Sequence, residues 1–482
     1  MLHGRFAPRL AGAAAAVLLV SSCGSNATTN TAAGVLDTRL AGSTRLDRNG
    51  WIYVHLEGPP AQLGFQHGYL LTAEIRDLLR VTKPLLQQLT KRDWNFYRQA
   101  AETVLWPKTD PEYQTEIDGI VAGLAAHDAG QPAIDRWDVV ALNGMLELAY
   151  YYVPMLDKQA GKAPTVTSPE SCSAFVATGG YTSDHRIVMA HNAWTDYVVG
   201  SRWDIVFDLA PAAGQHILMD GLPGVIVSDD DFDITSAGLM VTETTITKFE
   251  GFDPAGVPEF VRARKAIQYG SSIDDFARIM LDGNNGGYAN DWLIGDNKTG
   301  EVARLELGLK FHSLERTKDG YFVGSNFPVG NDLMTQETTF DPKNAASSAN
   351  ARHARWDQEM AAFKGRIDAT IARQFESDSY DIVDRRSGPS ERSLCGTVET
   401  SPRGIPDWDW APYFPGGTVQ AKVTTGAMTD AMTLDATSGH PCGRDFIAAD
   451  FLAAHPAFAW AKGLLRDMKS QPWTTFKSGM RP

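Results

Sequence analysis

The cysteine at position 172 stands where a loop gives way to a strand pattern, and its chemistry is the most specific feature of the sequence. The preceding run, GKAPTVTSPES, is rich in Gly, Pro and hydroxyl residues and predicts an exposed loop. A thiol has an ordinary pKa of about 8.5 and an α-amino group one of about 7.7–8.0. If the Ser171–Cys172 bond were cut, the new amine could take the proton of its own thiol near neutrality. The alternative is a small buried hydrophobic residue, which is the common role of an arbitrary cysteine.

Self-cleavage would create this combined nucleophile and base. In the uncut chain the amine is locked in a peptide bond, so the precursor lacks the base. Activation would proceed by attack of the Cys172 thiol on the carbonyl of Ser171, and water would then hydrolyse the resulting thioester. We therefore expect one fragment that ends at Ser171 and a second that begins at Cys172, and we expect the two to remain associated.

The segment that begins at Ser171 resembles the start of the catalytic subunit of N-terminal nucleophile (Ntn) hydrolases, specifically the phospholipase B-like proteins and the C45-type acyl-transferase peptidases. The matching features are Cys-Ser-Ala-Phe at a strand start, a Thr-x-Asp turn, and Met-Ala-His-Asn-x-Trp at a strand end. The resemblance runs from about Trp51 to Trp473. Its other motifs fall in the expected order: GPPAQLGFQHGYLLTAEI, ETTI, NNGGYANDWLIGD, LELGL and GHPCG.

The resemblance implies an α+β fold, namely an αββα sandwich preceded by a helical N-terminal section. It implies a cysteine-nucleophile hydrolase that acts on acyl ester or amide bonds through a thioester acyl-enzyme, with no cofactor. The substrate would be a small acylated molecule, either a lipid or an N-acyl compound. Two alternatives stay open: an acyl-transferase of the same fold, and a surface lipoprotein that binds a ligand without catalysis.

The resemblance also assigns candidate site residues beyond Cys172. Asn290, in GGYAND, is the first candidate to stabilise the oxyanion, although an Asn in a glycine-rich turn is often structural. Asp291 would orient the amine or cap the turn. Thr244, in TETTI, offers a hydroxyl that could bond the nucleophile's amine, although β-branched residues favour strands in any case.

His191, Asn192 and Trp194 form a second candidate cluster, with His191 in proton handling and Trp194 at the wall of the acyl pocket. Strict strand alternation places His191 on one face and the other two on the opposite face, so all three line one cleft only with a bulge or a strand end. Bile-salt hydrolases and ceramidases carry an Arg and an Asp in the corresponding region, where this chain has Val188 and His191. Substrate inference from those relatives therefore does not carry over.

The N-terminus resembles a bacterial lipoprotein signal. Arg5 and Arg9 precede a short apolar stretch, and Val20-Ser21-Ser22-Cys23 matches a lipobox. This implies a signal peptide over residues 1–22, lipidation of Cys23, and a flexible tether over residues 23–45. We expect an exported cell-envelope lipoprotein that contacts the membrane through its lipid; an ordinary secretory peptide is the alternative.

The remaining cysteines and the composition narrow the function classes. If Cys23 is lipidated and Cys172 is the nucleophile, then Cys395 and Cys442 are the natural disulfide pair in an oxidising setting, the alternative being two unlinked thiols. No CxxC or HExxH pattern suggests a metal site. The 482 residues carry a formal charge of -14 and no basic run, which argues against nucleic acid as a partner.

The chain pattern predicts a change of character at the cleavage site. Residues 46–171 are mostly helical in periodicity, whereas residues 172–482 form the expected catalytic domain. In that domain β-rich runs precede helices at residues 258–269 and 273–281, and more strands follow. We expect the first runs to form one sheet and the later strands a second sheet, with helices outside.

Overall fold

The computed structural model describes residues 37–128, 130–166, 171–229 and 232–481. A compact unit comprises Arg39–Pro482. The predicted signal peptide and the lipidation site at Cys23 lie outside the described residues. Among the described helices no single one is long and apolar enough to span a membrane. One bent pair of helices, Arg136–Asn143 with Met145–Gln159, has the length and the apolar composition of a membrane span.

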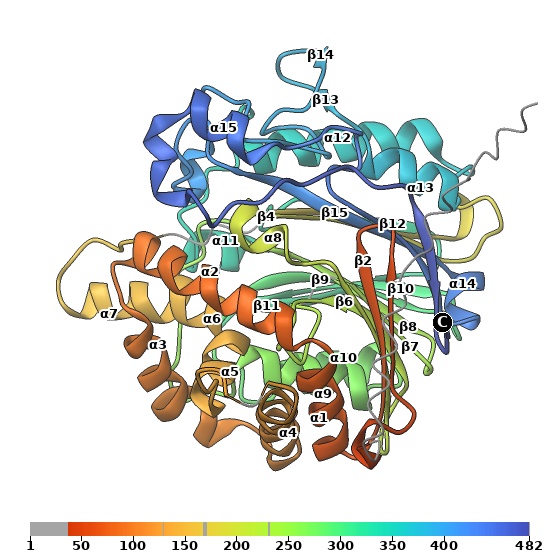
Figure 1. Cartoon of the computed structure of the whole chain (residues 1–482). Helices are drawn as coiled ribbons and strands as arrows, with labels where there is room; N and C mark the ends of the chain where they lie inside the picture. The colour runs from red at the N-terminus through yellow and green to blue at the C-terminus, as the bar shows by residue number, and fades with distance from the viewer. Residues whose placement is uncertain (1–36, 129, 167–170, 230–231, 482) are drawn as a thin grey trace, which may run out of the picture. The chain divides into compact units, whose positions relative to one another are not determined.

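Two sheets form the centre of the compact unit (Figure 1). The larger has nine strands in the order β1 (Thr44–Arg48), β2 (Trp51–Gly58), β5 (Ile205–Pro211), β6 (Ile217–Gly221), β7 (Phe232–Thr235), β8 (Leu239–Thr245), β9 (Asn290–Asp296), β10 (Glu301–Leu307) and β11 (His312–Thr317). The smaller has six, in the order β12 (Gly320–Gly324), β3 (Ser171–Thr178), β4 (Val188–Asp196), β15 (Gly416–Thr425), β16 (Thr433–Ser438) and β17 (Thr474–Lys477). The one parallel pairing among these strands joins β2 to β5.

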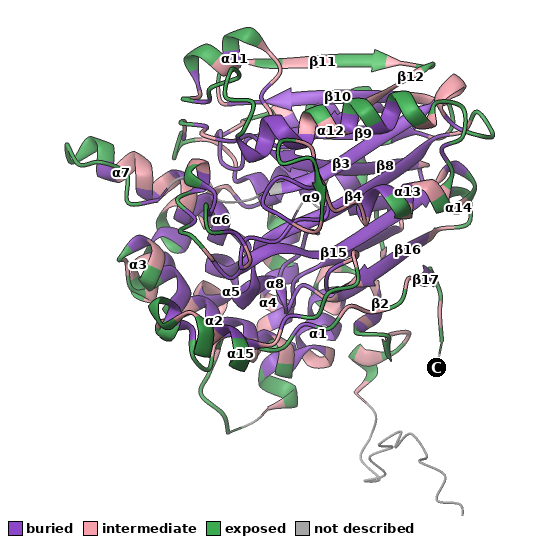
Figure 2. Ribbon diagram, turned by 90° about the horizontal axis from the view of Figure 1, so that it is seen from above, coloured by how far each residue is buried: buried purple, intermediate pink, exposed green. Residues whose placement is uncertain are grey.

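The sheets pack face to face through apolar side chains that alternate along their strands. Ala174 and Val176 of β3 and Met189 of β4 share one buried cluster with Met240 of β8 and Leu293 of β9. Figure 2 shows β3, β4 and β15 buried over most of their length, whereas the edge strand β11 is largely exposed. The core between the sheets is therefore the layer toward which alternate residues of β3 and β4 point.

Helices cover both outer faces, as Figure 1 shows. The larger sheet is covered by α1 (Pro60–Leu70), α4 (Pro111–His127), α9 (Glu259–Tyr269) and α10 (Ile273–Leu281), and the smaller by α12 (Ser348–Phe363) and α13 (Ala369–Glu376). Close contact between α1 and α4 depends on glycine, because a Cβ at Gly64 would lie 1.8 Å from the carbonyl oxygen of Glu116. The expected α+β sandwich in αββα layers is confirmed.

The other helices join these layers or lie at their ends. They are α2 (Thr72–Thr90), α3 (Trp94–Ala100), α5 (Arg136–Asn143), α6 (Met145–Glu147), α7 (Val153–Gln159), α8 (Tyr197–Gly200), α11 (Asn331–Gln336), α14 (Gly426–Asp430) and α15 (Ala448–Ala454), with π-helical turns η2 (Ala101–Leu105) and η4 (Leu148–Tyr152). A small hairpin pairs β13 (Tyr380–Asp381) with β14 (Arg386–Ser387).

Three expectations about chain organisation are corrected. The strands before and after α9 and α10 do not form separate sheets, since β5 to β8 continue into β9 to β11 while β3 and β4 pair with β12 and β15. The front section is not helical at its start, because residues 44–58 form β1 and β2. The predicted tether ends too late, since the compact unit already includes residues 39–45, where Arg45 pairs with Glu74 of α2.

Candidate active site

Cys172 is the second residue of β3. Strand alternation puts its side chain on the same face as Ala174 and Val176, toward the larger sheet. The residue is 2% exposed, and it is the free cysteine among the described residues. Its backbone nitrogen donates a hydrogen bond to Oδ1 of Asn326 at 3.1 Å. The proposed nucleophile thus begins a central strand of the smaller sheet and is fixed by its main chain.

Asn326 and Arg352 together hold the main chain of Cys172. The side-chain oxygen of Asn326 also accepts from Nη2 of Arg352 at 2.8 Å, and its Nδ2 donates to the carbonyl of Thr245 at 2.7 Å. Nη1 of Arg352 donates to the carbonyl oxygen of Cys172 at 2.6 Å and to Oγ of Ser173 at 3.1 Å. One planar guanidinium therefore fixes the strand start and the amide that holds it.

The guanidinium of Arg352 is fully buried, and burial lowers its pKa to about 9. That value leaves it charged at neutral pH. It lies 5.0 Å from the ring centroid of Trp194 and 5.6 Å from that of Trp408, so two aromatic faces compensate part of its lost hydration.

His191 and Glu243 lie beside the thiol. One imidazole nitrogen of His191, one carboxylate oxygen of Glu243 and the sulfur of Cys172 all lie within 4.8 Å of one another. Burial, followed by the positive charge of Lys422, holds the pKa of His191 well below its ordinary value, so the ring is neutral at neutral pH. These ligand types could hold a metal ion, as could His55, Asp208 and His216 elsewhere in the fold.

Asn192 and Trp194 lie on the opposite face of β4, as strict alternation predicts. The amide nitrogen of Asn192 donates to the carbonyls of Glu376 at 2.7 Å and Leu394 at 3.3 Å. The indole nitrogen of Trp194 donates to the same Leu394 carbonyl at 3.1 Å. The structure therefore brings His191 to Cys172 but directs these two side chains toward α13 and the segment before Cys395.

Asn290 and Thr244 lie on neighbouring strands of the larger sheet. Asn290 begins β9 opposite Thr245, whose carbonyl accepts from Asn326, and both amide atoms of the buried Asn290 side chain have no hydrogen-bond partner among the described residues. Thr244 packs on Gly324 of β12, where a Cβ would lie 2.4 Å from its hydroxyl oxygen. In the uncut chain the Cys172 nitrogen donates to Asn326, and the expected bond between Thr244 and the free amine stays a prediction.

Asp291 lies opposite Glu306 of β10, and both are buried. Burial, with the nearby charge of Glu306, raises the pKa of Asp291 well above its ordinary value. A carboxyl kept neutral in this way is a hydrogen-bond donor or acceptor rather than a fixed negative charge.

Sequence reasoning missed Asn326, Arg352 and Glu243. Asn326 follows β12 with a positive φ of 65°, and Asn is one of the few side chains that tolerate this conformation. Arg352 lies in α12, and no local sequence motif marks it as a site residue. Glu243 could have been identified from the sequence, since it is the first residue of the ETTI motif that contains Thr244.

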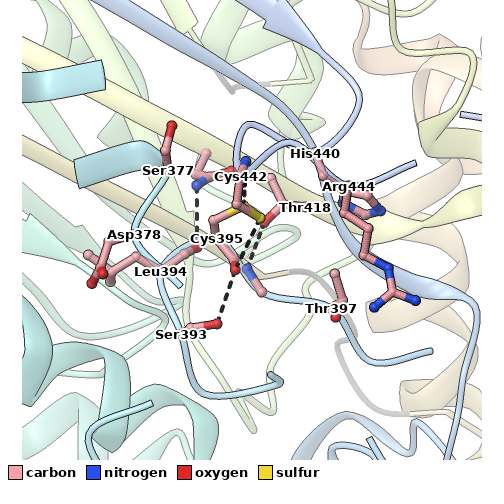
Figure 3. The surroundings of a disulfide bond; sticks show 12 residues. Ser377, Asp378, Ser393, Leu394, Cys395, Thr397, Thr418, His440, Cys442 and Arg444 are labelled. Carbon is pink, nitrogen blue, oxygen red and sulfur yellow. Dashed lines mark hydrogen bonds between the residues drawn. A yellow bond between two sulfur atoms is a disulfide. The ribbon is translucent and has the colours of Figure 1, made fainter. Parts of the chain in front are cut away.

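Cys395 and Cys442 form a disulfide, the pair that the cysteine count predicts (Figure 3). The carbonyl of Cys395 accepts from Oγ of Ser393 at 3.0 Å, and its nitrogen donates to the carbonyl of Asp378 at 2.8 Å. The disulfide thereby holds the segment that contains Leu394, whose carbonyl accepts hydrogen bonds from the side chains of Asn192 and Trp194.

Comparisons with known proteins find sequence similarity to phospholipase B and phospholipase B-like proteins. The model of the family described as Phospholipase B matches residues 75–311. An uncharacterized protein of Archaeoglobus fulgidus is 26% identical over 52% of this chain and 42% of its own length. The putative phospholipase B-like 2 of Rattus norvegicus is 32% identical over 30% of this chain and 27% of its own, and phospholipase B-like 1 of Bos taurus is 23% identical over 49% and 48%. The chain thus spans less than half the length of these relatives.

Among solved structures, penicillin V acylase from Agrobacterium tumefaciens aligns over 55% of this chain and 83% of its own, with 11% identity and a TM-score of 0.32.

Proposed function

We propose that this chain, whose residues 75–311 match the model of the family described as Phospholipase B, is a self-processing hydrolase of acyl ester or amide bonds with Cys172 as its nucleophile. The observation that carries the proposal is the hydrogen bond from the Cys172 nitrogen to Oδ1 of Asn326. This nitrogen is the atom that cleavage of the Ser171–Cys172 bond would convert into the α-amino base. The base would therefore be formed at a position already fixed.

Processing begins with the Cys172 thiol, whose sulfur attacks the carbonyl carbon of Ser171. The carbon–nitrogen bond breaks, the nitrogen takes up the proton that the thiol lost, and a thioester joins Ser171 to the sulfur. Water then adds to the thioester, which releases the carboxylate of Ser171 and restores the thiol. Asn326 and Arg352 hold the strand start throughout, because both bond its main chain.

Turnover repeats the same chemistry on a substrate. The free α-amine accepts the thiol proton, the sulfur attacks the acyl carbon, and the alcohol or amine departs with that proton. The buried amide of Asn290 is our candidate donor to the oxyanion, because it is the unpaired polar side chain at the start of the neighbouring β9. Neutral His191 beside the thiol can donate or accept a hydrogen bond without adding charge.

The two fragments stay together because the fold shares one sheet between them. β2 of the front fragment pairs with β5 of the catalytic fragment over seven residue pairs. Arg264 of α9 forms a buried ion pair with Glu116 of α4, at 3.1 Å. Separation would expose a sheet edge and break a buried ion pair, which costs about 3–5 kcal/mol when one partner is removed.

Export and anchoring belong to the same proposal. The lipobox ending at Cys23 would place diacylglycerol on that thiol, and the disulfide between Cys395 and Cys442 suits an oxidising compartment. A membrane-held hydrolase would meet lipid or N-acyl substrates at the surface. The formal charge of -14 makes nucleic acid an unsuitable partner.

The first experiment is the mass of the mature chain after expression. Wild type should appear as two fragments, with Cys172 at a new N-terminus, whereas Cys172→Ala should stay whole and folded. Ser171→Ala is the matched control, and it should still be cut because the attacking thiol is kept. A stably intact wild-type chain, or cleavage of Cys172→Ala at the same bond, would refute self-processing.

The second experiment compares substrates. Lysophospholipids and N-acyl amino acids should separate ester from amide specificity, and added amines should not raise the rate of thioester breakdown if water is the acceptor. Formation of an acylated amine at the expense of free acid would make the chain an acyl-transferase. No turnover of either class by the processed protein would favour a binding role.

A further inference from the structure

Three metal-ligating side chains meet where the two expected self-cleavage fragments are joined. His55 lies on β2 of the front fragment, Asp208 lies on β5 of the catalytic fragment, and His216 directly precedes β6. His55 and Asp208 are neighbours in the parallel pairing of β2 with β5. One ligand atom from each of the three side chains lies within 4.8 Å of the other two. The cluster therefore spans the junction between the fragments.

The carboxylate of Asp208 lies between the two imidazole rings. Its Oδ2 lies 2.6 Å from Nδ1 of His55, and its Oδ1 lies 2.6 Å from Nε2 of His216. Two imidazole nitrogens and a carboxylate are ligand types that zinc prefers. In the metal-free protein a ring proton occupies each of these two contacts, and a bound cation would take the place of both protons.

Neighbouring groups fix the orientation of these ligands. The hydroxyl of Tyr53 and the backbone nitrogen of Gly479 donate to Oδ2 of Asp208, at 2.6 Å and 2.7 Å. The other ring nitrogen of His55, Nε2, lies 3.3 Å from a carboxylate oxygen of Glu57. A carboxylate on the far nitrogen of a ligating histidine fixes the tautomer of the ring and raises its basicity. The cluster thus includes the supporting hydrogen bonds that zinc ligands generally have.

The cluster is closed on one side and reaches solvent on the other. Asp208 is fully buried and His55 is 5% exposed, whereas the side chain of His216 is 31% exposed. Ligands around a tetrahedral zinc lie about 3.3 Å apart when the bonds are about 2.0–2.1 Å long, so the ring of His216 would withdraw from the carboxylate by about 0.7 Å. Its partial exposure leaves room for this shift. The hydroxyl oxygen of Ser478 lies 3.2 Å from the same ring nitrogen, on the side where a fourth ligand would approach.

We propose that His55, Asp208 and His216 bind a zinc ion that clasps the two fragments together. Metal binding itself needs only the fold, whereas the clasp role rests on the proposed self-cleavage. Zinc suits this donor set better than calcium or magnesium, because those hard cations prefer oxygen ligands. Zinc also has no redox chemistry, which suits the oxidising setting that the disulfide between Cys395 and Cys442 favours.

The first test measures zinc binding to the intact Cys172→Ala chain, in which the group of Cys172, His191 and Glu243 has lost its sulfur. Equilibrium dialysis should find one bound zinc ion that calcium does not displace. His216→Gln should weaken zinc binding by more than about 100-fold, because the loss of a supporting partner alone costs about 10–100-fold. His312→Gln, at the exposed start of β11, is the matched control and should bind zinc like its parent. Equal zinc binding in folded His216→Gln, or no binding in the parent, would overturn the assignment.

X-ray absorption tests the same assignment even if His216→Gln does not fold. The zinc spectrum of the loaded Cys172→Ala chain should show nitrogen and oxygen ligands at about 2.0–2.1 Å, with the scattering pattern of imidazole. A sulfur ligand at about 2.3 Å would place the zinc at a cysteine and overturn the assignment. Glu57→Ala removes the carboxylate beside His55 and should weaken zinc binding by about tenfold.

The clasp role is tested in processed wild type. Size-exclusion chromatography should show that the two fragments separate at a higher urea concentration with zinc than with a chelator. His216→Gln should abolish this difference, and His312→Gln should keep it. If the Cys172→Ala chain binds zinc at this site but wild type stays uncut, the metal site stands and self-cleavage fails. If processed fragments bind zinc yet separate at the same urea concentration with and without it, the clasp role fails.

Discussion

The backbone nitrogen of Cys172 lies 3.1 Å from the side-chain oxygen of Asn326, a residue separated from it by 154 positions in the chain. This bond gives the α-amine of the processed enzyme a fixed direction. Asn326→Ala removes the acceptor and should slow turnover by about 10²–10³-fold, as loss of one fixed polar group does in comparable sites. Single-turnover kinetics of the processed protein checks this.

The control for Asn326 is Asn326→Asp, because aspartate keeps an oxygen acceptor and tolerates the positive φ of 65°. It should retain more activity than Asn326→Ala. Its lost amide donor to the carbonyl of Thr245 should instead lower stability. Equal activity in both variants would show that the bond to Cys172 plays no part in the chemistry.

Arg352 should not be replaceable by lysine. Its guanidinium donates to the Cys172 carbonyl, to Asn326 and, through Nε, to Oγ of Ser348 at 3.1 Å, a fork that an ammonium group cannot reproduce. In the uncut Cys172→Ala background, Arg352→Lys should lower the free energy of unfolding by about 1–3 kcal/mol. Urea titration measures this, with Arg366→Lys, at an exposed position after the end of α12, as control.

The two faces of β4 predict different losses. His191→Gln, beside the thiol, should reduce kcat/KM by about 100-fold or more while leaving the chain folded. Because burial keeps its pKa well below the ordinary value, the pH dependence of kcat/KM around neutrality should come from the α-amine and survive this substitution. Steady-state rates between pH 5 and 9 test both statements.

Asn192→Ala is the opposite-face counterpart. It removes two hydrogen bonds to the carbonyls of Glu376 and Leu394, so it should lower the free energy of unfolding by about 1–3 kcal/mol with kcat/KM unchanged. A large fall in kcat/KM without loss of stability would show that Asn192 has a catalytic role instead.

Local sequence patterns could predict the elements but not their neighbours. Short runs of β-branched and aromatic residues identify β3, β4, β5, β6 and β8, because each run shows the side-chain alternation of a strand. That alternation also separates His191 from Asn192 correctly. It carries no information on pairing, so the division of β4 and β5 between two sheets could not be read from it.

The nucleophile and its holders differ in the same way. Cys172 is visible because a loop changes to a strand at its position. Asn326 and Arg352 reach it from 154 and 180 positions away, and Arg352 sits in a helix whose sequence looks like any charged helix. Contacts of this kind are set by tertiary packing, which a single sequence does not display.

A buried carboxylate far from Cys172 predicts a pH dependence of stability. Asp208 accepts from His55 and His216, both at 2.6 Å, and from the backbone nitrogen of Gly479 at 2.7 Å. Burial pushes the pKa of Asp208 upward, but hydrogen bonds from His216, His55 and Tyr53 outweigh it and hold the pKa below its usual range. The hydrogen bond to Asp208 raises the pKa of His55 above its ordinary value.

The signs of these shifts define a pH window. The lowered pKa of Asp208 adds stability above its ordinary value of about 3.9, which is lost as the pH falls further. The raised pKa of His55 adds stability below about 6.5, which is lost as the pH rises through its folded value. The melting temperature of Cys172→Ala should therefore fall on both sides of this window. His55→Gln should remove the loss on the alkaline side; an unchanged alkaline slope would contradict the assignment.

Loss of the disulfide between Cys395 and Cys442 should lower stability and loosen the segment that contains Leu394, whose carbonyl accepts a hydrogen bond from Trp194. The two cysteines are 47 residues apart in sequence, and closing a loop of this size stabilises a fold by about 4 kcal/mol in the chain-entropy model. In the double variant Cys395→Ala/Cys442→Ala the free energy of unfolding, measured by urea titration, should therefore fall by that amount. Because Leu394 holds the indole of Trp194, and Trp194 lies against Arg352, self-cleavage should also slow. Mass measurements over time separate the two effects: a stability loss with unchanged cleavage rate would show that the Leu394 segment does not position the Cys172 strand.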